Sequence, residues 1–249
     1  MTARLLVAPP RLVAGRLTID GDDHAYLFRV RRLAVGDAIV VFDGAGREAP
    51  AVAVEVGAAH AVLDVAAPRE VPRPAPHVTV VQSALKGERM DWCLEKLVEV
   101  GADAVVVVET ARAVVRLDAD RRAKRQVRHQ RIAQEAARQC GRADVPPVVA
   151  LPDLKAALAG LAAEVRLVAD PATDAPVLAA VPLTAASVAL VVGPEGGLTV
   201  DEIAAAVAAG CVPVSLGATV LRAETAGAAA VFAIRALRAA RAAGMAGFP

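Results

Sequence analysis

Two glycine turns near the C-terminal end constrain this chain more than any other feature. The short apolar run 188–192 ends in the turn Gly193–Gly197 (GPEGG), and a second apolar run, 212–216, ends at Gly217. Short apolar runs bounded by glycine are typical of buried strands. In an open α/β sheet a ligand binds outside the carboxyl ends of neighbouring strands. The sequence therefore predicts a ligand site formed by these two turns.

A helix is predicted between the two turns, and another after them. Thr199 and Glu202 have the spacing of a capping box, which begins a helix, and Gly210 is suited to end it. The segment 221–225 is predicted to be a loop that leads into a last helix, at about 226–243.

Strands and helices alternate from His77 onward, which predicts a mainly parallel sheet in an α/β domain. The other expected strands lie at 78–82, 105–108 and 165–169, and the other expected helices at 88–100, 120–140 and 153–163.

The N-terminal part has a different pattern. Short apolar runs at 38–42, 51–56 and 60–65 are separated by turn signals, which is typical of a small β-barrel or sandwich. Four prolines then fall between Pro68 and Pro76, as in a linker between domains. We therefore expect a first domain at 1–70 and a second at 75–249.

Several classes of protein are disfavoured by what the sequence lacks. The three cysteines form no C-x-x-C pair and the four histidines are scattered, so neither a disulfide framework nor a metal site is predicted. Neither the dinucleotide fingerprint G-x-G-x-x-G nor a P-loop is present. Prolines interrupt the apolar N-terminal segment before a signal sequence can form, and glycine and proline interrupt the longer apolar stretches. We expect a cytoplasmic protein that does not span a membrane.

Positive charge is concentrated in one segment of a nearly neutral chain. Between Arg112 and Arg142 there are ten Arg or Lys residues and three acidic ones. Such a run can be a solvated helix face, but the dominance of arginine favours phosphate binding. A second basic cluster adjoins Tyr26 and Phe28, and stacking combined with phosphate contact is how single-stranded RNA is commonly held. The candidate RNA-binding residues are Arg29, Arg32, Arg138 and Arg142.

Six segments in this order resemble one family. They are 24–36 (HAYLFRVRRLAVG), 86–91 (KGERMD), 95–101 (EKLVEVG), 135–142 (EAARQCGR), 193–197 (GPEGG) and 216–226 (LGATVLRAETA). Together they resemble the ribosomal RNA small subunit methyltransferase E family of the SPOUT class, over nearly the whole chain. Ala218 departs from the pattern, because proline is expected there, and this puts the rigidity of that loop in question.

The resemblance implies a fold and an activity. The expected fold is a PUA-like β-barrel followed by an α/β SPOUT methyltransferase domain with a C-terminal trefoil knot. The expected activity is S-adenosylmethionine-dependent methylation of N3 of a uridine in 16S rRNA, within the 30S subunit, by a homodimer. Two alternatives stay open: a SPOUT enzyme that methylates a ribose 2′-hydroxyl or another base, and a non-catalytic RNA-binding ribosome-assembly factor.

The resemblance also assigns roles to residues of the two turns. Uridine N3 becomes nucleophilic only as its proton leaves, so Glu224 is expected to accept or orient that proton and Arg222 to stabilise charge on a neighbouring oxygen. The alternative is that these two side chains pair with each other or cap the last helix. The residues expected to hold S-adenosylmethionine are Leu190, Val192, Gly193, Pro194, Glu195, Gly196, Gly197, Leu216, Gly217, Val220 and Leu221.

Overall fold

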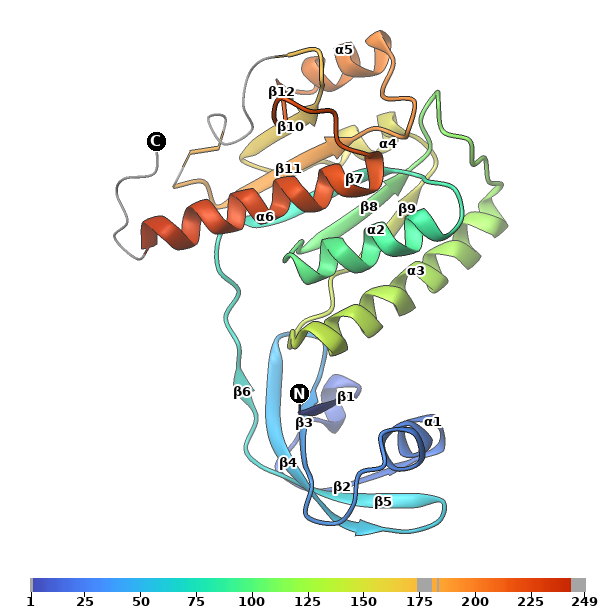
Figure 1. The fold of residues 1–249 in the computed structure, drawn as a ribbon, viewed down its shortest axis with the longest axis vertical. Helices are drawn as coiled ribbons and strands as arrows, with labels where there is room; N and C mark the ends of the chain where they lie inside the picture. The colour runs from blue at the N-terminus through green and yellow to red at the C-terminus, as the bar shows by residue number, and fades with distance from the viewer. Residues whose placement is uncertain (1, 174–180, 183, 243–249) are drawn as a thin grey trace. The chain divides into compact units, whose positions relative to one another are not determined.

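The computed structural model describes residues 2–173, 181–182 and 184–242 (Figure 1). The chain divides into two compact units. The first comprises Met1–Arg73 and Gln134–Val145, and the second comprises Pro74–Ala133 and Pro146–Pro249. The first unit is therefore discontinuous in sequence, and the division at Arg73 falls in the proline-rich segment.

The first unit contains a six-stranded sheet with the strand order β1-β3-β4-β5-β2, and β6 pairs with β4. β1 is parallel to β3, and the other pairings are antiparallel. A π-helical segment, η2 (Ala25–Val30), follows the short helix α1 (Gly21–His24), and a 3₁₀ turn, η1, covers Pro9–Arg11. The strands are β1 (Ala3–Leu6), β2 (Gly15–Asp20), β3 (Ala38–Phe42), β4 (Arg47–Val56), β5 (His60–Val65) and β6 (Arg69–Glu70).

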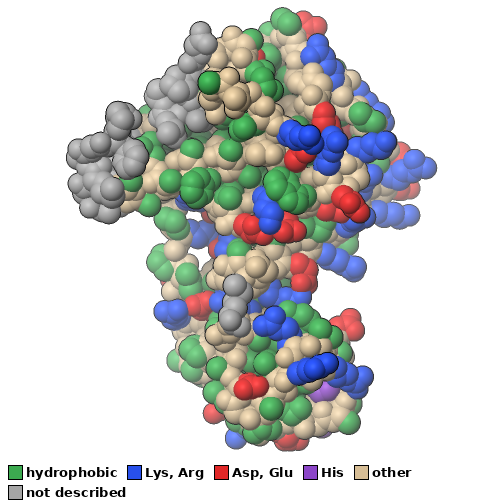
Figure 2. Space-filling view, in the orientation of Figure 1, with side chains coloured by type: hydrophobic (Ala, Val, Ile, Leu, Met, Phe, Trp, Pro, Cys, Tyr) green, Lys and Arg blue, Asp and Glu red, His purple; other side chains and the backbone are tan. Residues whose placement is uncertain are grey.

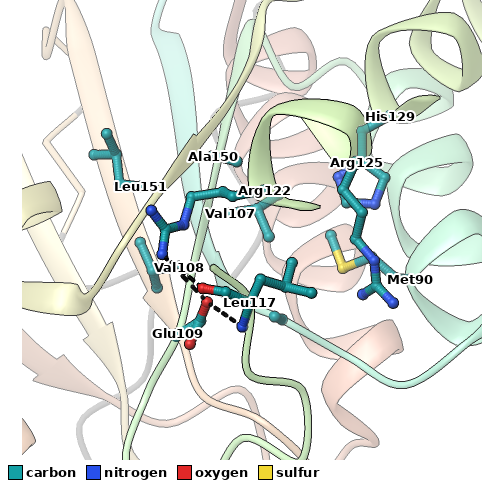
Figure 3. Close-up of a pocket in the computed structure, with 11 residues that line it drawn as sticks. Met90, Val107, Val108, Glu109, Leu117, Arg122, Arg125, His129, Ala150 and Leu151 are labelled. Carbon is teal, nitrogen blue, oxygen red and sulfur yellow. Dashed lines mark hydrogen bonds and ion pairs between the residues drawn. The ribbon is translucent and has the colours of Figure 1, made fainter. Parts of the chain in front are cut away.

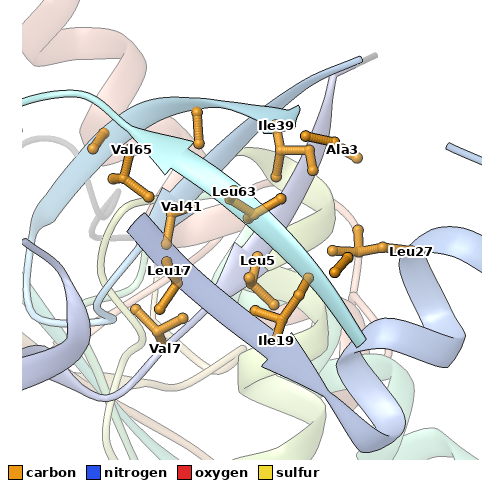
Figure 4. Packing of buried hydrophobic residues seen from close by; sticks show 14 of the residues in the cluster. Ala3, Leu5, Val7, Leu17, Ile19, Leu27, Ile39, Val41, Leu63 and Val65 are labelled. Carbon is orange, nitrogen blue, oxygen red and sulfur yellow. The ribbon is translucent and has the colours of Figure 1, made fainter. Parts of the chain in front are cut away.

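One aliphatic core holds this sheet together (Figure 4). Leu5 of β1 and Ile19 of β2 share it, although these strands stand at opposite ends of the strand order. Alternate residues of β1 to β5 point into it, as the two-residue period of a half-buried strand requires. The strands predicted at 38–42 and 60–65 are confirmed with the same bounds, whereas β4 begins four residues earlier than expected.

The second unit contains a six-stranded sheet in which every pairing is parallel, with the order β12-β10-β11-β7-β8-β9. The predicted parallel sheet is thus confirmed. β9 was not predicted from the sequence, and β12 is shorter than the apolar run that predicted it. The strands are β7 (His77–Ser83), β8 (Ala104–Val108), β9 (Val148–Leu151), β10 (Val165–Ala169), β11 (Ser187–Val192) and β12 (Val212–Val214).

Helices cover both faces of this sheet (Figure 1). α2 and α6 pack together, with α6 on β7 and β11, whereas α4 and α5 contact the strands β8, β9, β10 and β12. Gly227 permits the close approach of α6, because a Cβ there would lie 3.2 Å from the Leu97 side chain. The helices are α2 (Glu88–Glu99), α3 (Ala119–Cys140), α4 (Leu154–Ala159), α5 (Val200–Ala208) and α6 (Ala223–Ala242). Among the described residues, no helix is long and apolar enough to cross a membrane.

Two helix boundaries differ by more than one residue from the sequence prediction. α6 begins at Ala223, because the Arg222 carbonyl accepts hydrogen bonds from the N–H groups of Thr225 and Ala226, both at 2.9 Å. Glu224 therefore lies in the first turn of α6 and not in a preceding loop. α4 ends at Ala159, where Gly160 follows, and is shorter than predicted. The predicted end of the last helix at Ala243 lies outside the described residues.

Candidate functional site

The carboxyl ends of β10, β11 and β12 border a cavity of about 710 Å³. The turn after β11 and the segment between β12 and α6 form most of its lining. Ala169–Pro171, at the carboxyl end of β10, also lines it. The structure thus brings together the two glycine turns that the sequence pairs. Cavities of this size are typical of sites for small molecules and cofactors.

Most residues of the predicted cofactor site line this cavity. The exception is Leu190, which is fully buried in the middle of β11, in register with Leu167 of β10 and Val80 of β7. The lining residues that the sequence predicted are Val192, Gly193, Pro194, Glu195, Gly196, Gly197, Leu216, Gly217, Val220 and Leu221.

The glycines of the turns are needed for different reasons. A Cβ at Gly193 would lie 2.9 Å from the backbone nitrogen of Leu198, so the turn closes too tightly for any side chain. Gly197 has a φ of 70° and Gly217 a φ of 130°, which L-residues rarely adopt. A Cβ at Gly196 would lie 3.3 Å from Cβ of Arg112, so a side chain there meets the protein itself.

Neighbouring elements hold the first turn in place. The capping box of Thr199 and Glu202 is confirmed, and the second carboxylate oxygen of Glu202 also accepts from the N–H of Ala111 at 2.7 Å. Arg112 Nη1 donates to the Gly196 carbonyl at 2.9 Å. The loop after β8 therefore supports the turn, and Arg112 itself also lines the cavity.

Glu224 is buried at the edge of the cavity, with 9% of its surface exposed. Its Oε2 atom has no hydrogen-bond partner among the described residues. This oxygen therefore neither caps α6 nor pairs with Arg222. Arg222 is exposed and lines the same cavity. A buried acceptor without a donor costs free energy, which a ligand N–H could recover.

Cys93 of α2 is an electrostatic neighbour of Glu224. Burial, with a smaller contribution from the charge of Glu224, raises the pKa of the Cys93 thiol to about 12. The thiol therefore stays protonated at neutral pH and donates to Oε1 of Gln82. A protonated, buried thiol is a poor nucleophile, so Cys93 has a packing role.

The predicted RNA-binding arginines all lie in the first unit, in two different environments. Arg138 lies over the ring of Tyr26, 4.2 Å from its centroid, and pairs with Glu135; Arg142 pairs with Asp144. Their side chains are only 17% and 14% exposed. By contrast, Arg29 and Arg32 are exposed, although Arg29 also donates to the Ala58 carbonyl.

In the second unit, exposed cations form a stripe on the N-terminal part of α3. Arg121, Lys124, Arg128 and Arg131 are exposed and three or four residues apart, which places them on one face of the helix. Figure 2 shows Lys and Arg side chains gathered on the side of the view where α3 lies in Figure 1. We call these four residues the α3 stripe; the sequence identified the charged segment but not its exposed face.

A second, smaller cavity of about 20 Å³ lies beside α3 (Figure 3). Met90, Val107 and Leu117 line it together with Arg122 and His129. It has room for about one water molecule and is too small for a cofactor. Within the described part of the chain, no group of His, Cys, Asp and Glu residues could hold a metal ion.

Comparison with known families gives two matches. Residues 72–235 match a family described as an RNA methyltransferase domain. Residues 19–62 match a family described as an RNA methyltransferase PUA domain. The second match coincides with the central part of the first unit.

Curated proteins with the name ribosomal RNA small subunit methyltransferase E are similar over most of their length. The protein of Mycobacterium tuberculosis is 39% identical over 219 residues, which cover 86% of this chain and 83% of the relative. The protein of Synechocystis is 34% identical over 240 residues, covering 91% of this chain and 75% of the relative.

Solved structures are similar over nearly the whole chain. Ribosomal RNA small subunit methyltransferase E from Neisseria gonorrhoeae, bound to S-adenosyl methionine, has a TM-score of 0.83 and 30% identity, covering 95% of this chain and 98% of that one. A putative methyltransferase from Legionella pneumophila, in complex with the same cofactor, has a TM-score of 0.86 and 27% identity, with the same coverage. Given these matches and the two glycine turns around one cavity, the chain belongs to the ribosomal RNA small subunit methyltransferase E family.

Proposed function

We propose that this chain transfers a methyl group from S-adenosylmethionine to N3 of a uridine in 16S rRNA. The observation that carries the proposal is the cavity between the two glycine turns, which is lined by Glu224, a residue whose Oε2 has no hydrogen-bond partner among the described residues. A methyltransferase needs a cofactor site and an adjacent group that can receive the proton displaced from N3. The cavity and the Glu224 carboxylate are the candidates for these two parts.

The residues around the cavity suit the cofactor. Backbone groups of Gly193–Gly197 and of 216–221 would hold the adenosine and methionine parts, with the aliphatic side chains of Val192, Leu216 and Leu221 against the adenine. When bound, S-adenosylmethionine supplies a sulfonium methyl group that needs no activation. The protein's task is to position uridine N3 and to handle its proton.

Glu224 and Arg222 divide that task. Glu224 accepts the proton from N3 through Oε2, which frees the nitrogen lone pair for the new bond to carbon. Arg222 donates hydrogen bonds to the uracil oxygen on which negative charge develops. Their position supports this division, because both line the cavity and no described residue donates a hydrogen bond to Glu224 Oε2.

RNA binding is proposed for exposed cations of both units. Arg29, Arg32 and the α3 stripe are exposed, and they would contact phosphates. Arg138 and Arg142 are proposed to act mainly through their positive potential, because protein partners engage most of both side chains. Arginine suits this function because its planar donors match phosphate oxygens.

The family suggests further features of the fold and the assembly. We propose that the first unit is a closed PUA-like barrel and that the second contains a trefoil knot. The knot is supported by the chain path, since β12 lies at the sheet edge and α6 returns to pack on β7 and β11. We further propose a homodimer that modifies the assembled 30S subunit in the cytoplasm.

Mass spectrometry of rRNA nucleosides from a deletion strain tests the activity. Loss of 3-methyluridine from 16S rRNA, restored by the gene, is the expected result. Loss of a ribose-methylated nucleoside would instead indicate 2′-hydroxyl methylation. An unchanged nucleoside profile would indicate a non-catalytic assembly factor.

A further inference from the structure

A second hollow adjoins the proposed cofactor cavity. Its volume is about 370 Å³, and Glu88, Arg89 and Trp92 of α2 line it together with Glu224 and Thr225 of α6. Arg89 and Glu224 also line the larger cavity, so the two spaces share a wall. A molecule in the hollow would therefore lie beside the carboxylate that faces the cofactor cavity.

Trp92 is unusual among the apolar residues of α2. Met90, Cys93, Leu94 and Leu97 are all buried, whereas Trp92 is 43% exposed. It is the single tryptophan of a chain in which only 2% of residues are aromatic. A large exposed aromatic ring beside a hollow is a suitable platform for stacking a planar ligand.

The polar groups of the hollow complement one edge of uracil. Glu224 Oε2 is a buried acceptor with no partner in the described part of the chain, and it suits the N3–H donor. Arg89 is half exposed and, among the described residues, makes one ion pair, of 3.3 Å with Glu195, so its remaining donors suit a ring carbonyl. Uracil presents N3–H between two carbonyl oxygens, which needs an acceptor and a donor side by side.

We propose that this hollow receives the target uracil, flipped out of the RNA, with Trp92 as its stacking platform and Arg89 as a donor to a ring carbonyl. The inference rests on the proposed function and assigns the base-binding part of the same site. Enzymes that modify a base commonly extrude it into a pocket and hold it by stacking. The hollow is large enough for one pyrimidine nucleotide.

The fluorescence of the single tryptophan tests the inference in the wild-type protein. A short single-stranded RNA with one uridine is titrated in the presence of S-adenosylmethionine, and binding is followed independently by anisotropy of a label on the RNA. Stacking of the uracil should quench Trp92, whereas an otherwise identical RNA with an abasic site should bind with little quenching. Equal quenching by both RNAs, or binding without quenching, would overturn the inference.

Single-turnover methylation of 30S subunits that lack the modification gives a second test. Trp92→Ala should lower the rate about 10- to 100-fold, which corresponds to the loss of one stacked base. Trp92→Phe should recover much of it, and affinity for S-adenosylmethionine should be unchanged in both variants. Val149→Ala removes a similarly exposed apolar side chain, 40% exposed on β9, and serves as the control.

The two hypotheses fail differently. Absence of 3-methyluridine with the wild-type protein would count against the proposed function, whichever way Trp92 responds to the RNA. Normal methylation by a folded Trp92→Ala variant would leave that function intact and reject the base-binding role. Fluorescence that depends on protein concentration but not on RNA would place Trp92 in a protein interface and also reject it.

Discussion

Arg112 Nη1 donates a hydrogen bond to the carbonyl of Gly196, 2.9 Å away, and the Arg112 side chain fills the space beside the Gly196 Cα. A residue of the loop after β8 thus fixes the turn after β11. The turn's shape depends on this outside support as well as on its own glycines. This relationship determines how substitutions in the turn should act.

The first prediction concerns the glycines of this turn. Gly196→Val should abolish binding of S-adenosylmethionine, because the side chain would displace Arg112 and distort the turn. Gly193→Ala should also reduce affinity at least about 10-fold, since its Cβ would collide with backbone atoms that cannot move independently. Calorimetry measures both effects.

Gly160→Ala is the matched control for these glycine variants. Its Cβ would lie 4.0 Å from the nearest atoms, and the residue lies at the end of α4, away from the cavity lining. Its affinity for the cofactor should equal that of the wild type. Unchanged affinity in a folded Gly193→Ala protein would contradict the proposed role of the turn.

The second prediction concerns the proton acceptor. Glu224→Gln preserves shape but removes the charge, so single-turnover methylation should fall by roughly 100-fold or more, the usual scale of general base catalysis. High pH should relieve the defect, because N3 then loses its proton without assistance. Affinity for S-adenosylmethionine should remain normal.

Asp201→Asn is the matched control for Glu224→Gln. Asp201 also lies in the first turn of a helix, α5, so its loss has the same effect on the helix dipole. The Asp201→Asn variant should methylate at the wild-type rate. Near-normal turnover by Glu224→Gln would reduce Glu224 to a structural residue and leave positioning alone to explain catalysis.

The third prediction concerns RNA binding. Replacing Arg121, Lys124 and Arg131 together by glutamine should weaken binding and lower the slope of log affinity against log salt, by about 0.7 to 0.9 for each lost phosphate contact. Arg29→Gln with Arg32→Gln should act in the same way. Filter binding over a range of salt concentrations measures the slope.

Arg138 and Arg142 should behave differently from the exposed arginines. Their replacement by glutamine removes the Tyr26 stacking and the Asp144 pair, so thermal stability should fall while the salt slope changes little. An unaltered slope in the α3 stripe variant would show that the stripe is only a solvated helix face.

The sequence predicted the central features of the site because they depend on local patterns. The glycines and the Thr199–Glu202 capping box that follows them leave few backbone alternatives. The predicted turn and α5 are both confirmed for this reason. The pairing of the turns followed from the parallel sheet, which places the carboxyl ends of β10, β11 and β12 at one edge.

Other features depend on tertiary contacts and could not be read from the sequence. The isolation of Glu224 Oε2 and the hollow beside Trp92 arise where α2 and α6 meet, and nothing in either helix sequence indicates these two features. Likewise, Arg138 looked like a phosphate ligand, but Tyr26, distant in sequence, covers it. Charge composition identifies a basic helix, whereas packing decides which of its residues remain exposed.

The fourth prediction concerns assembly. Phe232 of α6 is 62% exposed, on a helix rich in alanine, and such a surface allows close approach of a second copy. Light scattering at micromolar concentration should give a mass near twice the 25.5 kDa of the chain. Phe232→Glu should shift this toward the monomer, and a monomeric wild-type protein would contradict the homodimer.

The last prediction concerns His129 and the pH dependence of stability. His129 is 4% exposed on α3 and lines the small cavity of Figure 3, where its Nδ1 atom has no hydrogen-bond partner among the described residues. Burial lowers the pKa of this imidazole to about 4, and nearby Arg125 and Arg128 act in the same direction against the opposing charge of Asp91. The folded protein therefore holds His129 neutral where the unfolded chain would protonate it.

The sign of the effect follows from proton binding. Between the unfolded pKa of 6.5 and the folded pKa of about 4, the unfolded state binds more protons, so the free energy of unfolding falls as pH falls. The full loss is roughly 3 kcal/mol, reached near the lower end of this window. The carboxyl groups of Asp43 and Glu48 have pKa values below their usual range. Their contribution to the free energy of unfolding is therefore lost at lower pH than that of His129, so the two effects can be separated. Urea unfolding at several pH values should therefore give a smaller decline for His129→Gln than for the wild type, and equal declines would contradict a buried neutral His129.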